Sequence, residues 1–352
     1  MELKRTVACV CSDGKIRLIE EPVPELKPGT VRIRSHASLV SPGTELGGWK
    51  KLFSRRGAED TGERRRFGYS SAGIVDAVGE GVTQFAPGDR VAAIGYGLAL
   101  HSDWAVVPQN LCVKLPAEVT DEQGSYAMLL ATALQAVRRG APEIGEKAAV
   151  VGMSLVGQLT AQLLQASGCR VIGWARNDCQ VEIAKQWGIA EAINMKSCDP
   201  VAVTKAFTEG RGLDQSVFAF PGQAGETWDQ TLACMKCTPD GHLMGRVVVV
   251  GGSEMNVKWI PANLDIRIAA RTGPGYHDAA WELGRDYPPV FMQWTTRTNL
   301  EVCMDLIRYG TVNVDCLTTH RIHLDRAEAE IDAIENAESI MGLVFVNGGA
   351  KE

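Results

Sequence analysis

The distribution of apolar and polar positions changes character near residue 121. Before it, short segments alternate apolar and polar residues, most regularly over 30–37, and a period of two is typical of a strand with one solvated face. Turn sequences such as Gly79-Glu80-Gly81 and Pro87-Gly88-Asp89 separate these segments. The pattern predicts that the first 120 residues are β-structure with little helix.

After residue 121, strand-like and helix-like segments alternate. The expected strands are 148–151, 170–174, 190–193, 214–218, 246–250 and 266–270, and the expected helices are 156–167, 179–187, 200–208 and 225–235. This rhythm predicts a parallel, doubly wound Rossmann sheet. A further helix is expected at 298–309, and the chain is expected to return to strands at 317–324 and 343–346.

The two patterns predict two domains in a chain of 352 residues, which is long for a single core. We assign residues 1–120 and 310–352 to a β-rich catalytic domain. Residues 121–309 are assigned to the Rossmann domain. The expected fold class is α/β plus β.

Composition narrows the function classes. The chain has 45% apolar and 22% charged residues, as an ordinary globular protein does. Its net charge of −6 does not indicate the positively charged surface that binds nucleic acid. The sequence contains no run of about 18 uncharged apolar residues, so it predicts no membrane-spanning helix. The N-terminus lacks the apolar core of a signal peptide, so we expect a cytoplasmic protein. Of ten cysteines only Cys234 and Cys237 have metal or redox spacing, and free thiols are expected.

The stretch 49–67 is locally basic. It holds Lys50, Lys51, Arg55, Arg56, Arg64, Arg65 and Arg66 against three acids. A solvated loop is the simpler interpretation, and an anion-binding lid is the alternative.

A glycine pattern closes the first strand of the second region and opens a long apolar helix. It reads Gly152-Met-Ser-Leu-Val-Gly157, which is the dinucleotide-binding pattern G-x-G-x-x-G with Ser154 in place of the second glycine. Serine is small enough to leave room for a pyrophosphate, and its hydroxyl can bond to phosphate. The expected cofactor-binding residues here are Gly152, Ser154, Leu155, Val156 and Gly157, joined by Gly251 after a later strand.

The end of the second Rossmann strand predicts which dinucleotide binds. A site for NAD usually places Asp or Glu there to hold the ribose hydroxyls, whereas this chain has Ala175 followed by Arg176 and Asn177. A guanidinium suits a 2′-phosphate, and Asn177 adds a neutral donor. We therefore expect NADP (NADPH), although Arg176 as an ordinary surface residue is the simpler alternative.

With these residues in view, the chain resembles the medium-chain dehydrogenase/reductase superfamily over almost its whole length. The segments that carry the resemblance are Pro28–Ile33, Val78–Val82 and Phe85–Val91, in this order. The resemblance implies a β-rich lobe like a chaperonin-10 barrel followed by a Rossmann domain. It also implies oxidoreductase activity, but no particular substrate.

The resemblance also shows a departure. Members with catalytic zinc carry Cys in a stretch like G-x-C-G-T-D and His and Glu in a later G-H-E-x-x-G. Here Pro42 stands for the cysteine, Tyr69 for the histidine and Ser70 for the acid. Proline cannot bind zinc, so the zinc chemistry of the family is not expected to carry over.

Without a metal, hydrogen-bond donors must stabilise the charge that hydride transfer builds on a carbonyl oxygen. Tyr69 is the first catalytic candidate, and as a general acid it would need a lowered pKa. Thr44, at the position of the family's relay hydroxyl, is the second. The alternatives are that Tyr69 only lines the cleft and that Thr44 caps a helix. Ser41 and Glu45, in the same stretch, are expected to contact substrate.

A second polar cluster, Arg271 to His277, follows the last Rossmann strand. Loops beyond the carboxyl ends of parallel strands form the ligand crevice, so Tyr276 and His277 are expected to bind a polar substrate. A subunit contact is the alternative. The strand 266–270 would leave an unpaired sheet edge, which predicts a homodimer.

Three functions remain open from sequence. The first is an NADPH-linked oxidoreductase acting on the carbonyl or alcohol of a polyol, sugar or cyclitol. The second is a reductase of activated C=C bonds, which needs no metal. The third is a nucleotide-binding protein without turnover.

Overall fold

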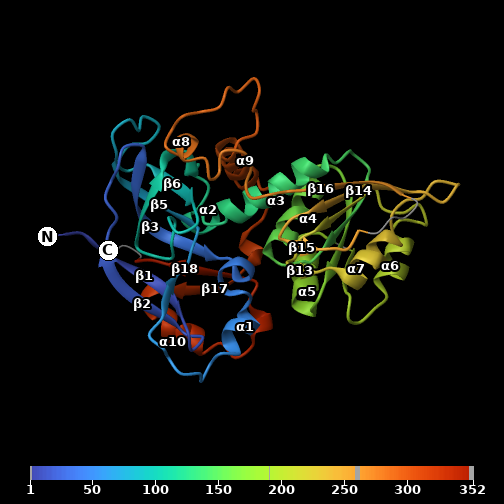
Figure 1. Ribbon diagram of the computed structural model, residues 1–352, viewed down its shortest axis with the longest axis horizontal. Helices are drawn as coiled ribbons and strands as arrows, with labels where there is room; N and C mark the ends of the chain where they lie inside the picture. Colours follow the sequence, from blue (N-terminus) through green and yellow to red (C-terminus); the bar gives the residue numbers. More distant parts are fainter. Residues whose placement is uncertain (1, 190, 258–261, 349–352) are drawn as a thin grey trace. The chain divides into compact units, whose positions relative to one another are not determined.

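The computed structural model describes residues 2–189, 191–257 and 262–348, which fall into two compact units. The first unit runs up to Ala131 and includes Gly273–Gly310 and the chain from Leu317 onwards. The second consists of Thr132–Thr272 and Thr311–Cys316. Figure 1 shows strands prevailing in the first unit and alternating strands and helices in the second, so the predicted fold class is confirmed.

The first unit contains two β-sheets. The larger has the order β17-β18-β3-β5-β6-β8, and β7 also pairs with β3. Its strands are β3 (Thr30–Val40), β5 (Ser70–Val78), β6 (Arg90–Ile94), β7 (Trp104–Pro108), β8 (Cys112–Lys114), β17 (Thr318–His323) and β18 (Gly342–Val346). The smaller sheet, β2-β1-β4, consists of β1 (Lys4–Cys11), β2 (Ile16–Pro22) and β4 (Arg64–Arg66).

Helical segments complete the first unit, and two of them interrupt a region predicted to have little helix. After β3 the chain forms one π-helical turn, η1 (Pro42–Leu46), and then a short helix, α1 (Trp49–Phe53). The others that begin in this unit are α2 (Asp121–Gly124), α3 (Ala127–Gly140), α8 (Ala279–Glu282), α9 (Thr296–Arg308) and α10 (Ala327–Asp332). Because α8 and α9 contact the segment before β8, residues 273–310 pack with the β-rich unit rather than with the Rossmann sheet.

The second unit is a six-stranded parallel sheet with helices. Its order is β11-β10-β9-β12-β14-β16, the doubly wound arrangement with the reversal between β9 and β12. The strands are β9 (Lys147–Val151), β10 (Arg170–Ala175), β11 (Glu191–Asn194), β12 (Gln215–Phe218), β14 (Leu243–Val249) and β16 (Ala262–Ile268), with a small pair β13 (Gly222–Gln223) and β15 (Ser253–Glu254). The helices are α4 (Leu155–Ala166), α5 (Asp178–Gln186), α6 (Pro200–Phe207) and α7 (Gly225–Leu232).

Strand β16 lies at one edge of this sheet. Its side chains are less buried than those of the central strands, and Ile266 and Ile268 are 40% and 71% exposed. An edge strand presents unpaired backbone groups to solvent or to a partner. Among the described residues, no helix is both long and apolar enough to cross a bilayer.

Candidate active site

The π-helical turn η1 presents the first group of predicted site residues. The turn begins where Glu45 N–H donates to the Ser41 carbonyl oxygen (3.0 Å), and it ends at Gly47, whose φ of 68° is left-handed. Pro42, with its φ already fixed, occupies the first helical position, where no N–H is needed. The turn brings Ser41, Thr44 and Glu45 together at the end of β3.

Tyr69 is held rigidly next to this turn at the start of β5. Its side chain is 4% exposed, and its carbonyl oxygen accepts a hydrogen bond from Gly95 N–H (2.9 Å). The preceding residue must be glycine, because Gly68 has a φ of 124° and a Cβ there would lie 2.3 Å from the His101 backbone nitrogen. The local backbone therefore fixes where the tyrosine ring lies.

The two predicted catalytic residues, Tyr69 and Thr44, form one hydroxyl cluster with Ser41, which was expected to contact substrate. Burial raises the pKa of Tyr69 far above its usual value of 10.0, and the nearby Glu45 carboxylate raises it further; hydrogen bonds from Ser41 and Thr44 offset part of this shift. The lowered pKa that a tyrosine general acid would need is not found. Tyr69 keeps its proton and is a hydrogen-bond donor that resists ionisation.

The same shift sets a pH dependence of stability. The folded pKa of Tyr69 lies above the unfolded value, so the unfolded chain releases this proton first as the pH rises. The stability associated with the neutral hydroxyl is complete below about pH 10 and is lost as the pH rises toward the folded pKa.

Glu45 is buried at the base of the cluster. One carboxylate oxygen accepts the Ser41 backbone N–H at 2.5 Å, and the other lies 3.3 Å from His101 Nε2. The side chains of Glu45 and His101 are 1% and 0% exposed. The carboxylate that was expected to contact substrate therefore accepts a hydrogen bond from the protein on one oxygen and lies against His101 with the other.

Tyr276 and His277, the residues of the second predicted cluster that were expected to bind substrate, also lie in the first unit. The Tyr276 hydroxyl accepts the Tyr96 backbone N–H (2.9 Å), and its charge acts on the pKa of Tyr69. His277 is exposed, stacks against Tyr276 with 4.2 Å between ring centroids, and has a left-handed φ of 72°. Its backbone N–H donates to the Glu282 carboxylate (2.7 Å). Tyr276 thus lies near the hydroxyl cluster, and His277 lies outside it.

Ser70, at the remaining zinc-ligand position, makes hydrogen bonds that hold the protein backbone. The Ser70 hydroxyl donates to the Ser125 carbonyl oxygen (2.6 Å) and accepts the Met128 N–H (3.2 Å), so it fixes the start of α3. Within residues 2–189, 191–257 and 262–348, no three His, Cys, Asp or Glu side chains gather in a way that could hold a metal ion. The residues at these positions do not fit a catalytic zinc.

The basic stretch 49–67 is tied into this region. Arg65 donates to the Glu45 carbonyl oxygen at 2.6 Å and so supports the turn η1 from outside. Arg64 pairs with Asp60 at 2.8 Å. These contacts give two of its cations partners within the protein.

The second unit carries the glycine loop between β9 and α4. Gly152 has a φ of 94°, and a Cβ on Gly157 would lie 1.8 Å from the Gly152 carbonyl oxygen, so both positions require glycine. Ser154 has an ordinary φ of −73°, which explains why a side chain is tolerated there. Its hydroxyl makes no capping bond, and the first N–H groups of α4, from Leu155 and Val156, are the kind that bind phosphate. This cradle fits a dinucleotide.

The ends of the neighbouring strands complete the cofactor cradle. Gly251, after β14, has a φ of 97°. Ala175, at the end of β10, is fully buried, whereas Arg176 is exposed, lies 5.5 Å from the Phe220 ring centroid, and has no acidic partner among the described residues. Asn177 caps α5, because its side-chain oxygen accepts the Gln180 N–H at 3.0 Å. Arg176 is therefore the available cation at this strand end, and Asn177 has a structural role.

Two residues at these sites went unrecognised in the sequence. His101 precedes β7 with no motif around it, and its contact with Glu45 arises only when distant segments meet. Phe220 follows the end of β12, next to the strand reversal where a doubly wound sheet binds its ligand, and this position was the signal available.

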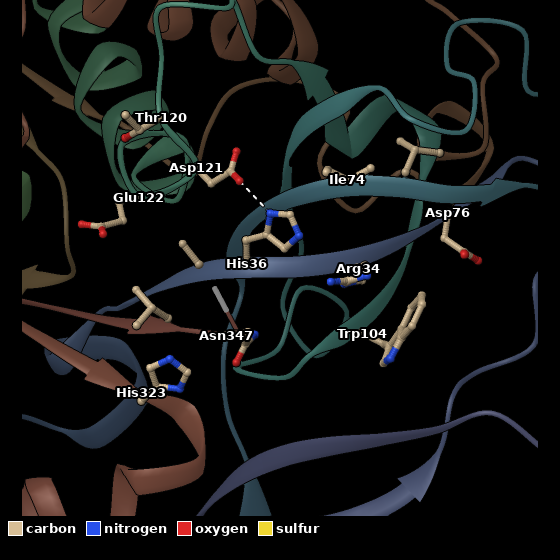
Figure 2. Close-up of a pocket in the computed structure, with 14 residues that line it drawn as sticks. Arg34, His36, Ile74, Asp76, Trp104, Thr120, Asp121, Glu122, His323 and Asn347 are labelled. Atoms are coloured by element: carbon tan, nitrogen blue, oxygen red, sulfur yellow. Dashed lines mark hydrogen bonds and ion pairs between the residues drawn. The ribbon is translucent and has the colours of Figure 1, made fainter. Parts of the chain in front are cut away.

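A groove of about 730 Å³ lies elsewhere on the first unit, and Figure 2 shows it around His36 and Asp121. Arg34 and His36 are the more exposed residues of β3 that line this groove, and buried Ala37 lines it as well. His36 Nδ1 lies 2.8 Å from the Asp121 carboxylate. None of the predicted site residues lines this groove.

Known protein families match both the β-rich region and the Rossmann region of the chain. A family model described as an alcohol dehydrogenase GroES-like domain matches residues 27–117, and one described as a zinc-binding dehydrogenase matches residues 156–273. Sorbitol dehydrogenase from Mus musculus is 27% identical, over 94% of this chain and 92% of its own length.

Solved structures show the same fold. An oxidoreductase/dehydrogenase of unknown specificity from Escherichia coli has a TM-score of 0.77 and 19% identity, covering 99% of this chain and 100% of its own. The 2R,3R-butanediol dehydrogenase from Bacillus subtilis has a TM-score of 0.72 and 22% identity, covering 98% of this chain and 100% of its own.

Proposed function

Since the chain belongs to the medium-chain dehydrogenase/reductase superfamily and is a dehydrogenase/reductase, we propose that it transfers hydride between NADPH and the carbonyl or alcohol of a polar small molecule without catalytic zinc. The observation that carries this proposal is the hydroxyl cluster of Ser41, Thr44 and Tyr69, which includes or adjoins the sequence positions that carry zinc ligands in zinc-containing members. A cluster of neutral donors can stabilise a developing alkoxide, which is the role of the metal in zinc-containing members.

The chain's own residues would divide the chemistry as follows. NADPH, when bound in the glycine-loop cradle, supplies the hydride. Tyr69 donates a hydrogen bond to the carbonyl oxygen, where negative charge develops. Because the raised pKa of Tyr69 opposes a lasting tyrosinate, a proton given to the oxygen is replaced through the adjoining hydroxyls of Ser41 and Thr44. Thr44 is exposed and provides the route to solvent.

The proposed substrate class is a polyol, a sugar or a cyclitol. Several hydroxyls converge on one place, and a ligand with several hydroxyls can both donate to and accept from them. Tyr276 adds a polar aromatic side chain near Tyr69. Sorbitol and butanediol dehydrogenases among the similar proteins support the same class.

The first prediction tests the reaction. With NADPH and a panel of polyhydroxylated ketones and enones, the product is expected to be an alcohol. Tyr69→Phe removes one donor to the developing alkoxide and should lower kcat/KM by about a hundredfold. Tyr309→Phe is the matched control, because Tyr309 is 71% exposed and should change nothing. A saturated ketone as the only product, or unchanged kcat/KM in Tyr69→Phe, would refute this reaction scheme.

We also propose NADPH as the preferred cofactor. The support is the exposed guanidinium of Arg176, which has no acidic partner among the described residues and lies beside a strand end where Ala175 offers no carboxylate. A charge-assisted hydrogen bond to a 2′-phosphate contributes roughly 1.5–3 kcal/mol, or about ten- to a hundredfold in affinity.

The second prediction follows from this arrangement. NADPH should bind at least about tenfold tighter than NADH, and Arg176→Ala should remove most of that difference while leaving NADH affinity nearly unchanged. Titration of cofactor fluorescence measures both. Arg170→Ala, which removes an exposed arginine of the same strand paired with Glu209, should preserve the preference. Equal weakening of both cofactors by Arg176→Ala would show that Arg176 does not read the phosphate.

We propose further that the protein is a homodimer joined through β16, whose edge position and exposed Ile266 and Ile268 support it. The third prediction is a dimer mass by light scattering at micromolar concentration. Ile268→Lys should shift the mass toward the monomer, because a buried unpaired charge is costly. A wild-type monomer under these conditions would contradict the proposal. We also propose a cytoplasmic location; the ten free thiols are compatible with a reducing compartment and support it.

A further inference from the structure

Two buried polar atoms face each other beneath the hydroxyl cluster without an assigned role. Glu45 Oε1 and His101 Nε2 are 3.3 Å apart, a close ion-pair contact, and neither atom has a hydrogen-bond partner among the described residues. Both side chains are essentially inaccessible. A buried carboxylate or imidazole nitrogen without a partner is costly, so attraction across this contact is what offsets the cost.

The neighbours of the imidazole determine where its proton lies. His101 Nδ1 is 2.9 Å from the Ser38 hydroxyl, which can either donate or accept. A proton on Nε2 makes the 3.3 Å contact with the Glu45 carboxylate attractive, whereas two facing lone pairs would repel. We therefore assign the Nε2–H form, with the carboxylate as acceptor.

The imidazole is also fixed in place. Its ring lies 4.6 Å from the Phe67 ring and 5.1 Å from the Phe345 ring, both edge-on. The His101 backbone N–H donates to the Phe67 carbonyl oxygen (3.1 Å), and the same backbone lies against Gly68. One residue thus contacts both the segment that leads into Tyr69 and the carboxylate beneath the turn η1.

We propose that His101 is the positioning residue of this site: through Nε2–H it holds the Glu45 carboxylate against the Ser41 backbone, and this fixes the hydroxyls of Ser41 and Thr44 around Tyr69. His101 touches neither substrate nor cofactor and acts through Glu45. The Nε2–H dipole also lowers the negative potential of the carboxylate oxygen beside a tyrosine that must donate a hydrogen bond. This inference rests on the proposed function for its effect on turnover, but not for its effect on Tyr69.

Paired substitutions separate positioning from packing. Gln places an amide near the Nε2 position, whereas Asn places one near Nδ1 and leaves Glu45 without a donor. We expect His101→Asn to lower kcat at least about tenfold with little change in the KM for NADPH, and His101→Gln to recover most of the loss. Phe345→Leu is the control, because it loosens the same ring contact without touching a polar atom. It should lower Tm but preserve kcat.

A second readout needs no substrate. With 3-fluorotyrosine at position 69, His101→Asn should move the ¹⁹F resonance and His101→Gln should largely restore it, while Phe345→Leu leaves it in place. Glu45→Gln, which breaks the same contact from the other side, should cause a similar shift if His101→Asn fails to fold. In the double variant with His101→Asn, the two effects on kcat should not add.

The outcomes also distinguish this inference from the proposed function. Equal shifts in His101→Asn, His101→Gln and Phe345→Leu, or additive effects of His101→Asn and Glu45→Gln, would overturn the positioning role. A ¹⁹F response specific to His101→Asn, in a protein whose Tyr69→Phe variant keeps full activity, would support the positioning role and refute the proposed chemistry.

Discussion

The carboxylate of Glu45, buried beside a tyrosine hydroxyl, is the constraint on which the candidate site depends. A buried negative charge must be satisfied from several directions, and here the Ser41 N–H and His101 provide the partners. The same charge, added to burial, raises the pKa of Tyr69 and keeps its hydroxyl protonated. In place of the zinc ligands the site therefore has an organised cluster of neutral donors, in which burial and the Glu45 carboxylate keep Tyr69 protonated.

The glycine loop of the second unit depends on a steric constraint instead. Because Gly157 has no Cβ, its backbone can lie close to the Gly152 carbonyl oxygen, and α4 can begin shortly after the end of β9. That geometry leaves the first N–H groups of the helix open to a phosphate. Ser154 departs from the glycine pattern without disturbing this arrangement, because its backbone is not left-handed.

Sequence periodicity predicted the strands and the order of elements well, because alternation and βαβ rhythm depend on local burial. It placed the start of the last Rossmann strand at Ile266, whereas β16 begins at Ala262, since an exposed edge strand has no apolar pattern to mark it. A helix capped by Thr44 was one alternative from the sequence, but the turn η1 already begins at Pro42 and contains Thr44; a single turn has no periodicity that would mark its start. The grouping of 273–310 with the β-rich unit and the contact between Glu45 and His101 depend on tertiary packing, which no local pattern reports.

The central claim is that hydroxyl groups do at this site what zinc does in related enzymes. The most direct test is metal analysis of the same preparation whose turnover is measured before and after exhaustive chelation. The account predicts protein free of stoichiometric zinc and a kcat that chelation leaves unchanged. Zinc bound in a one-to-one ratio, with activity that chelation abolishes and added zinc restores, would contradict it.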